Sequence, residues 1–417
     1  MPMRFLHCAD IHLDSPLRGL ERYEGAPVDE VRGATRRAFT NLVQCALREG
    51  VDFVVIAGDL YDGDWQDFNT GLFFARGMAQ LGESGIAVYV VRGNHDAASR
   101  ISRPLRLPAN VHLLPDRAPA SLVNEDLGLV VHGQGFATPA VTEDLAARYP
   151  AARRGYFNLG LLHTSLTGRQ GHEPYAPTTD QVLRGKDYQY WALGHVHARE
   201  VVARDPWVVY PGNLQGRHIR ERGAKGAELV TVDDGTITTE PVALDVLRWD
   251  ELALDIAGLA DLDALLDRAH GEVQARLAAA DGRILGLRVR LRGAGELHGE
   301  LHARPERVVE QLRAVALDAS HGAAWLEKVA LEARPAFDLA RFADGDDPVA
   351  LLARELVRPE AWLDDARVLL KDLRLKLPPE VARDEGLDLD DAGLLTELLR
   401  EAEDEILARL TREGGAR

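Results

Sequence analysis

The stretch IAVYVVRGNHDA, residues 86–97, joins a run of apolar residues to a cluster of polar ones within twelve positions. The apolar part, rich in branched and aromatic side chains, is typical of a buried β-strand. Gly93 ends it, and Asn94, His95 and Asp96 follow without a spacer. We expect Gly93 to free the backbone for a sharp turn. Three neighbouring polar groups cannot all face one centre, so we expect Asp96 to cap the following turn.

The same arrangement recurs along the first 245 residues. Further apolar runs end at polar residues in HCADIH (7–12), FVVIAGD (53–59), LGLLHTS (159–165) and YWALGHVH (190–197). LGLVVHGQGF (127–136) and WVVYPGN (207–213) are two more strand candidates. Residues 28–48, which stop before Gly50, and residues 68–81 show helical spacing between the strands. Alternating strands and helices predict an α/β fold with largely parallel sheets, in which the strand ends meet at one edge.

The residues at these strand ends are suitable metal ligands. They are Asp10, His12, Asp59, Asn94, His163, His195 and His197. Carboxylate, carboxamide and imidazole groups without a thiolate favour borderline or hard divalent ions such as Mn²⁺, Fe²⁺ or Zn²⁺. Seven ligands exceed the need of one ion, whereas two ions sharing one carboxylate fit the set and could both contact a phosphoryl oxygen.

The sequence pattern divides the chain into three parts. Residues 1–245 form the α/β domain. Residues 246–340 show two helical patterns among three strand patterns, which predicts a small α+β domain of βαββαβ or shorter βαβαβ type. Residues 341–417 are predicted to be a helical tail, interrupted at Pro378 and Pro379. Its apolar stripes are too few for a separate core, so we expect it to dock on a partner.

Composition narrows the class of protein. No apolar stretch approaches the roughly 20 residues that span a bilayer, and the N-terminal residues do not resemble a signal peptide. Cys8 and Cys45 are expected to be buried free thiols, which favours a cytoplasmic location. The net charge of −17 argues against a nucleic-acid partner, but −9 of it lies from Phe342 onward, so total charge does not decide the matter.

Taken together, DIH at 10–12, GD at 58–59, GNHD at 93–96, His163 and GHVH at 194–197 resemble the calcineurin-like metallophosphoesterase superfamily. HCADIHLDSPLRGL, GDLYD, YWALGHVH and YPGNLQGRHIRERGAKG further resemble SbcD-type DNA repair exonucleases of the YhaO-like branch. The resemblance implies an αββα sandwich of two mixed sheets. It also implies that residues 246–340 cap the site and guide DNA.

The resemblance assigns a role to each ligand position. It implies one ion held by Asp10, His12, Asp59 and His197, and a second held by Asp59, Asn94, His163 and His195. Asp59 would bridge the two ions. His95 matches the catalytic histidine, which is not a ligand and can donate a hydrogen bond or a proton to the leaving oxygen. Some relatives have a second histidine at the position of Asp62, so a two-histidine mechanism is in doubt; Asp62 could orient a neighbour such as His95 or cap the next helix.

The implied activity is Mn²⁺-dependent hydrolysis of DNA phosphodiesters together with an SbcC-like ATPase. The chain has no G-x-x-x-x-G-K-[ST] motif, so ATP use would require another chain. A homodimer is a further assembly found among such relatives, and no membrane partner is expected. The alternative is a metallophosphatase or phosphodiesterase that acts on nucleotides or other small phosphate esters.

Several residues outside the ligand set could contact DNA. The strongest candidates for phosphate contacts are Arg92, Arg217, His218 and Lys225, with Arg100 and Arg220 nearby. Tyr61 and Trp65 could stack on a base. His7, within the first strand, is predicted to be a hydrogen-bonded core residue, and His132 is a candidate for supporting the site.

Overall fold

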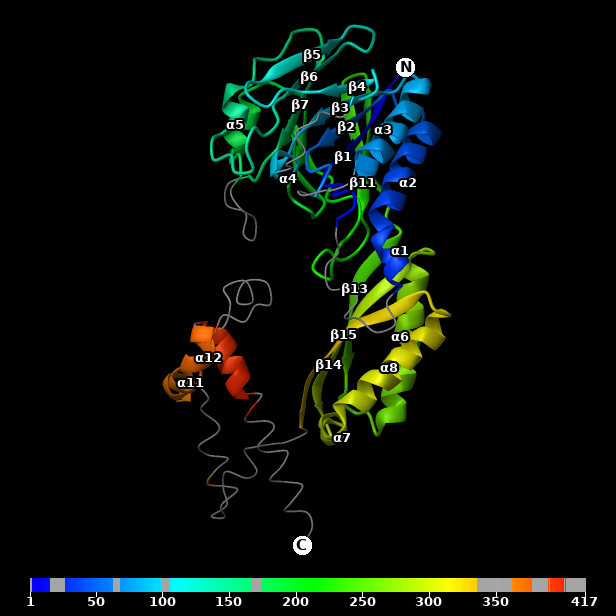
Figure 1. Cartoon of the computed structure of the whole chain (residues 1–417), viewed down its shortest axis with the longest axis vertical. Coiled ribbons are helices and arrows are strands. Elements are labelled where there is room, and N and C mark those ends of the chain that lie inside the picture. Colours follow the sequence, from blue (N-terminus) through cyan, green and yellow to red (C-terminus); the bar gives the residue numbers. More distant parts are fainter. Residues whose placement is uncertain are drawn as a thin grey trace. The chain divides into compact units, whose positions relative to one another are not determined.

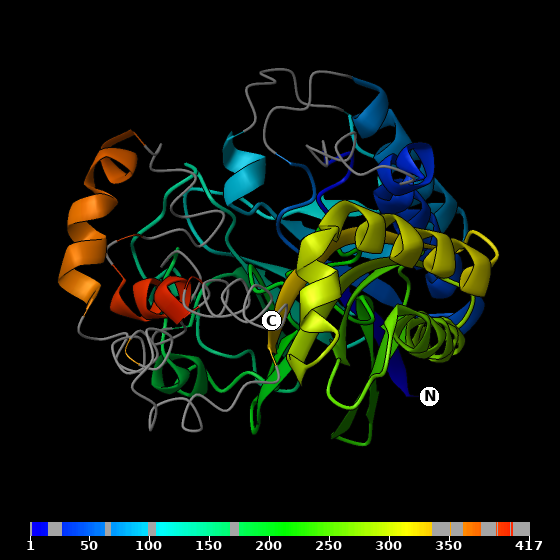
Figure 2. The ribbon, with the colours of Figure 1, turned by 90° about the horizontal axis from the view of Figure 1, so that it is seen from below.

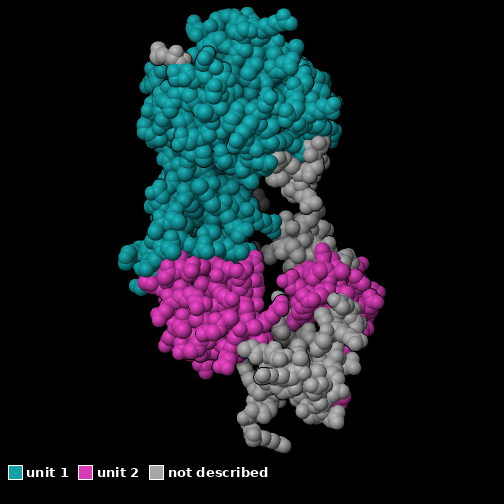
Figure 3. All heavy atoms as spheres, turned by 180° about the vertical axis from the view of Figure 1, so that it is seen from behind, with its two compact units in different colours: residues 1–251, 273–288, 316–328 teal, residues 252–272, 289–315, 329–417 magenta. Residues whose placement is uncertain are grey.

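A computed structural model of the chain describes residues 2–15, 27–62, 68–98, 106–166, 175–335, 351, 362–376, 389, 391–400 and 402. The chain divides into two compact units, coloured separately in Figure 3. The first comprises residues 1–251, 273–288 and 316–328. The second comprises residues 252–272, 289–315 and 329–417.

The first unit contains a six-stranded sheet of order β12-β11-β1-β2-β3-β4. Its strands are β1 (Met3–Cys8), β2 (Phe53–Ala57), β3 (Ala87–Val91), β4 (Val111–Leu113), β11 (Gly226–Asp233) and β12 (Thr236–Ala243). The strands β1 to β4 pair in parallel, whereas β11 pairs antiparallel with β1 and β12. The associated helices are α1 (Val28–Arg32), α2 (Ala34–Glu49), α3 (Phe68–Glu83) and α4 (Asn94–Ala98).

A second six-stranded sheet has the order β5-β6-β7-β8-β10-β9. Its strands are β5 (Ala120–Asn124), β6 (Leu129–Gly133), β7 (Phe157–His163), β8 (Tyr190–Gly194), β9 (Glu200–Arg204) and β10 (Trp207–Tyr210). The four central strands are parallel and both edge strands are antiparallel. The short helices η2 (Ala146–Arg148) and α5 (Asp180–Arg184) belong to this half.

Side-chain alternation in the strands builds the layers. In β1, Leu6 and Cys8 pack with α2 and α3, whereas Phe5 faces the second sheet and packs with residues such as Leu159 and Tyr190. The outer face of the second sheet, including Trp191, packs under η2 and α5. Figure 1 shows α2 and α3 along the outer side of the first sheet. The predicted fold class of two mixed sheets between helices is therefore confirmed.

Five strands of this domain were not predicted from the sequence: β4, β5, β9, β11 and β12. The expectation of largely parallel sheets is correct for β1 to β4 and for β6, β7, β8 and β10, whereas β11, β12, β5 and β9 pair antiparallel. The strand β11 lies beside β1, with Met3 paired to Val232, although more than two hundred residues separate them. Such a partner depends on tertiary structure, which local periodicity does not reveal.

The smaller sheet, of order β13-β14-β15, follows in the chain. Its elements are β13 (Leu247–Asp255), α6 (Leu262–Ala279), β14 (Ile284–Gly295), α7 (His298–Ala303), α8 (Pro305–Ser320) and β15 (Ala324–Pro335). This is the shorter of the two predicted layouts, βαβαβ, with the short helix α7 added. Figure 2 shows the helices α6 and α8 beside its strands.

The described tail residues are helical, in α11 (Leu363–Leu369), α12 (Lys371–Lys376) and residues 392–400. Within the predicted tail, residues 352–361 and the breaks at Pro378 and Pro379 lie outside the described residues. Among the described helices, none combines the length and apolar character needed to cross a membrane. Cys8 and Cys45 are buried free thiols, as predicted.

Candidate metal centre

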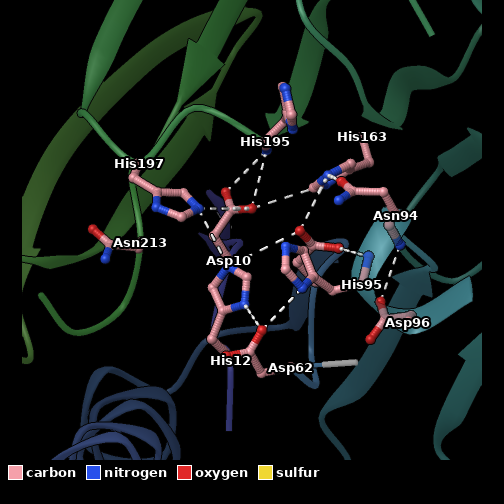
Figure 4. A network of polar contacts seen from close by, with 12 residues as sticks. Asp10, His12, Asp62, Asn94, His95, Asp96, His163, His195, His197 and Asn213 are labelled. Carbon is pink, nitrogen blue, oxygen red and sulfur yellow. Dashed lines mark hydrogen bonds and ion pairs between the residues drawn. The ribbon is translucent and has the colours of Figure 1, made fainter. Parts of the chain in front are cut away.

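The predicted ligands converge where the strands of the two sheets end (Figure 4). Asp10 and His12 follow β1, and Asp59 follows β2. Backbone hydrogen bonds join these two loops, because the Asp10 and His12 N–H groups donate to the carbonyls of Gly58 and Asp59 at 3.0 Å. The side chains of Asp10, His12, Asp59 and His163 are buried.

Four of the seven predicted ligands have a left-handed backbone. The φ angles are 49° at Asp10, 44° at His12, 49° at Asp59 and 99° at His195. Residues other than glycine rarely adopt this region, and each instance typically costs about 1–3 kcal/mol. Such strain gathers at functional sites, and it marks this cluster independently of the chemistry of its side chains.

One group of donor atoms comes from Asp10, His12 and His197, all within 4.8 Å of one another. Asp10 Oδ1 lies 3.8 Å from His197 Nε2, and the Nε2 atoms of His12 and His197 are 3.2 Å apart. His12 Nδ1 is buried and has no hydrogen-bond partner. Two imidazole nitrogens that face each other beside a carboxylate fit a shared divalent cation.

A second group comes from Asp10, Asp59 and His163. His163 Nε2 lies 3.5 Å from Asp59 Oδ2 and 2.9 Å from Asn94 Oδ1. His163 Nδ1 contacts the Ala57 carbonyl oxygen at 2.9 Å, so this nitrogen is already bonded and Nε2 is the one available to a metal. The donors of Asp59, Asn94 and His163 therefore fit a second cation.

His195 is placed differently from the other predicted ligands. It is not among the residues whose donor atoms gather within 4.8 Å. Its backbone N–H donates to both carboxylate oxygens of Asp10, at 3.2 and 2.9 Å, and its ring lies 5.2 Å from that of His163. Figure 4 shows the His195 ring directed away from Asp10. In this structure His195 supports Asp10 through its backbone.

The buried imidazoles are held in the neutral form that metal ligation requires. Burial lowers the pKa of His163 to about 3. Burial and the nearby Arg217 hold the pKa of His12 well below its usual range. Burial also lowers the pKa of His197, against the opposing effect of Glu221.

The two carboxylates of the cluster show the opposite shift. Burial, together with the neighbouring Asp59, raises the pKa of Asp10 well above its usual range. Burial likewise raises the pKa of Asp59 to about 6. Burial and the proximity of the two carboxylates disfavour their ionised forms, and bound dications would favour them.

His95 lies next to the cluster, and Asp62 fixes its ring. His95 Nδ1 is 2.9 Å from Asp62 Oδ1, while Asp62 Oδ2 accepts a hydrogen bond from Ser15 at 2.6 Å. Asp62 Oδ1 also lies 3.6 Å from His12 Nδ1. The hydrogen bond to Asp62 raises the pKa of His95. Burial raises the pKa of Asp62, but the facing imidazoles outweigh burial and hold this pKa well below its usual range.

The GNHD segment differs from expectation in two details. Asp96 lies within the first turn of α4, where its carboxylate accepts the backbone N–H of Gly93 at the start of the helix. It also accepts the N–H groups of Leu60 and Tyr61, and so ties this segment to the loop after β2. Gly93 does not have a positive φ. A side chain is excluded there for lack of space, because a Cβ at Gly93 would lie 2.2 Å from Asp59 Oδ1.

Sequence reasoning missed Glu221, which lies four residues after Arg217 and follows no strand end. Glu221 Oε1 is 2.6 Å from His197 Nδ1. Glu221 Oε2 accepts hydrogen bonds from the Arg217 backbone N–H and from Asn213 Nδ2. The irregular loop at 211–221 gives no periodic signal that would place this residue under the metal cluster.

Of the four residues predicted to contact DNA phosphates, two are exposed and two lie within or beside the metal site. Arg92 and His218 are exposed, and Arg92 pairs with Asp116. Arg217 instead lies within the site, 3.6 Å from Asp62 and 3.3 Å from Glu221. Lys225 is buried and its ammonium donates to the His197 carbonyl at 2.8 Å, so it supports the loop of His197 rather than offering a surface charge.

The remaining candidates lie apart from the site or outside the described residues. His7 is a buried core residue, as predicted, with ring nitrogens 3.1 Å from the Tyr190 hydroxyl and the Leu193 carbonyl. His132 contacts Ser121 and Asn158 in the second sheet. Tyr61 packs on the core beside α3. Arg100 and Trp65 lie outside the described residues.

Comparisons with known proteins find similar sequences and a similar structure. Residues 3–199 match the family of calcineurin-like phosphoesterases, and residues 249–334 match the middle domain of metallophosphoesterase YhaO. An uncharacterized metallophosphoesterase YhaO of Bacillus subtilis is 38% identical over 267 residues, 63% of this chain and 65% of that protein, so the match spans just under two thirds of that relative. A crystal structure of a dimetal phosphatase from Danio rerio is similar over 58% of this chain and 97% of that chain, with a TM-score of 0.37 and 13% identity.

Proposed function

We propose a function for this chain from its similarity to calcineurin-like phosphoesterases over residues 3–199 and to the middle domain of metallophosphoesterase YhaO over residues 249–334. The chain is proposed to be a two-metal phosphodiester hydrolase that cleaves DNA, acts with Mn²⁺ and works beside an SbcC-like ATPase in DNA repair. The observation that carries the hydrolase is the pair of donor clusters, Asp10–His12–His197 and Asp10–Asp59–His163, which share Asp10.

Asp59 is the better candidate for the bridging carboxylate. Its Oδ2 lies 4.0 Å from His12 Nε2 and 3.5 Å from His163 Nε2, so one oxygen faces the available nitrogens of both clusters. Asp10 approaches His163 at Nδ1, which the Ala57 carbonyl already occupies. The proposed ligand sets are Asp10, His12, Asp59 and His197 for one ion, and Asp59, Asn94 and His163 for the other, with His195 joining only if its ring turns.

Two bound divalent ions would polarise the phosphoryl group and activate water for in-line attack. The residues of the chain supply the remaining functions. The buried imidazoles stay neutral, and the backbone N–H groups of His95 and His195 orient the carboxylates of Asp59 and Asp10. Asp62 holds His95 Nδ1, which leaves Nε2 as the atom able to donate a proton to the departing oxygen. The raised pKa of His95 suits a general acid.

DNA is the proposed substrate because of the sequence resemblance and the charge beside the site. The segment that carries Glu221 also presents the exposed basic residues His218, Arg220 and Arg222, which could contact phosphates on either side of the scissile bond. The net charge of −17 favours the alternative, a phosphatase or phosphodiesterase acting on small phosphate esters.

The test is a direct comparison of substrates. The full chain is assayed with Mn²⁺ on end-labelled single- and double-stranded DNA and on small phosphomonoesters and phosphodiesters, with and without the ATPase. Cleavage of DNA well above the rate on small esters supports the proposal. Efficient hydrolysis of small esters with no DNA cleavage would replace it with the alternative, and substitution of other divalent ions tests the choice of Mn²⁺.

The helical tail is the proposed docking segment for the ATPase. Exposed apolar side chains on α11 and α12 support this role; they are Val368, Leu369, Leu373 and Leu375. Removing the chain from about Asp347 should spare Mn²⁺-dependent hydrolysis and abolish co-purification with the ATPase. Unchanged co-purification would show that the ATPase binds elsewhere.

A further inference from the structure

The two proposed ion positions differ in what holds their histidines. At one position the His197 ring is held by a side-chain carboxylate, Glu221 Oε1, at 2.6 Å. At the other, the His163 ring is held by the backbone carbonyl of Ala57 at 2.9 Å. A carboxylate is charged and its charge can be removed by substitution, whereas a backbone carbonyl is neutral and present whatever the side chain.

Glu221 is held in place by several contacts of its own. Besides His197, its carboxylate accepts the Arg217 backbone N–H at 2.7 Å and Asn213 Nδ2 at 2.9 Å, both on Oε2. Its side chain is only 7% exposed, so the surrounding loop rather than solvent sets its orientation. Arg217 Nη2 also donates to Oε1 at 3.3 Å, so both carboxylate oxygens are held by neighbouring groups.

The carboxylate oxygen 2.6 Å from Nδ1 fixes the tautomer of His197. The proton stays on Nδ1, and the lone pair of Nε2 faces His12 Nε2 at 3.2 Å and Asp10 Oδ1 at 3.8 Å. A carboxylate behind a histidine ligand also makes its imidazole more basic and therefore a stronger donor to a metal. These effects act on the position of His12 and His197 alone.

Arg217 offsets part of the negative charge of Glu221 and Asp62. Its guanidinium lies 3.3 Å from Glu221 Oε1, 3.4 Å from His197 Nδ1 and 3.6 Å from Asp62 Oδ2. It therefore links the carboxylate behind His197 with the carboxylate that holds His95. Arg217, in the 211–221 loop, therefore contacts the carboxylates of both Glu221 and Asp62.

From this geometry we infer that Glu221 is a positioning residue which acts through His197 and selectively sets the affinity of one of the two ion positions. The inference rests on the proposed function, since it requires two ions. It predicts that the two positions can be uncoupled by a change that touches no ligand.

The test measures metal binding directly. Metal-free full-length protein is titrated with Mn²⁺ by calorimetry, and electron paramagnetic resonance distinguishes an isolated Mn²⁺ from a spin-coupled pair. Glu221→Gln should weaken one of two binding events by about 10–100-fold and leave the other unchanged. Under conditions that fill both positions of the wild type, the variant should show isolated Mn²⁺.

Glu228→Gln is the matched control, because Glu228 is another buried glutamate of the same domain, paired with Arg199 rather than with a ligand. It should bind both ions as the wild type does. Glu221→Asp keeps the charge and should retain more Mn²⁺ affinity than Glu221→Gln. If the glutamine variant unfolds, the aspartate variant still tests the role of Glu221.

The outcomes separate the two proposals. Equal weakening of both positions in Glu221→Gln, or no change in either, would overturn the role of Glu221 while the two-metal site stands. If the wild-type protein binds fewer than two Mn²⁺ ions, both the proposed function and this inference are contradicted.

Discussion

The two sheets contribute unlike halves to the candidate metal centre. The first sheet supplies both carboxylates, Asp10 and Asp59, from loops whose backbones are left-handed and joined by hydrogen bonds. The second supplies His163 at the end of a regular strand, together with His197. The first half thus brings both carboxylates, together with His12 and Asn94, and part of its backbone is strained. The second half brings only imidazoles, and the Nδ1 atoms of His163 and His197 are already bonded.

This division shows how a buried site can favour cations without many buried charges. Only two carboxylates lie at the centre of the cluster, and burial raises the pKa of both. The imidazoles add donor atoms without adding charge, because their pKa values are lowered. The first half should therefore control whether metal binds at all, and the second should control geometry.

The strongest test of this division is Asp59→Ala. Since Asp59 Oδ2 faces the histidines of both clusters, its loss should empty both positions and abolish hydrolysis. Metal content after dialysis, measured by mass spectrometry, checks this. Retention of two tightly bound ions would show that the first half does not control metal binding.

A large effect of another kind is expected from His95→Ala. His95 is held by Asp62 and is not a proposed ligand, so turnover should fall by about 10²–10⁴-fold while both ions remain bound. Turnover and Mn²⁺ stoichiometry are measured on the same preparation. A drop in stoichiometry would make His95 a ligand and would enlarge the half supplied by the first sheet.

Gly93→Ala tests how tightly the first half is packed. The added Cβ would lie 2.2 Å from Asp59 Oδ1, so the carboxylate must shift, and turnover should fall by about 10²-fold. Gly271→Ala is the control, because a Cβ there meets nothing within 4 Å. If both variants keep wild-type turnover, the position of Asp59 is less constrained than its surroundings indicate.

The smallest expected effect is a change in pH dependence. The hydrogen bond to Asp62 raises the pKa of His95, and a general acid must be protonated, so activity should fall as pH rises through that pKa. Asp62→Asn removes the charge, lowers the pKa of His95 and should move this alkaline limb to lower pH. A pH–rate profile at saturating Mn²⁺ checks it; an unmoved limb would assign that limb to another group.

Much of this centre could be predicted because the ends of strands can be recognised in the sequence. An apolar run followed at once by Asp10, Asp59 or His163 marks both the strand and its edge of the sheet, and the structure brings these residues together. What a strand end does not reveal is side-chain direction. His195 follows β8 as clearly as the others follow their strands, yet its ring points away from Asp10.

The residues that support the centre were harder to predict. Glu221 and Lys225 both lie near the PGN segment, and both are buried. In the sequence they look like ordinary surface charges, because only the folded loop places Glu221 behind His197 and buries the Lys225 ammonium. Lys225 was accordingly assigned to DNA, although it donates to the His197 carbonyl. The role of Asp96 depends on backbone groups of a segment more than thirty residues away.

The left-handed backbones of Asp10, His12 and Asp59 also bear on how this sequence could drift. Glycine adopts such φ values without strain, so replacing these ligands by glycine removes a conformational penalty as well as a buried charge or imidazole. Inactive descendants would therefore gain stability at the positions where they lose the site. A chain that keeps these residues does so against the preference of its own fold, and selection for activity is the force that can maintain them.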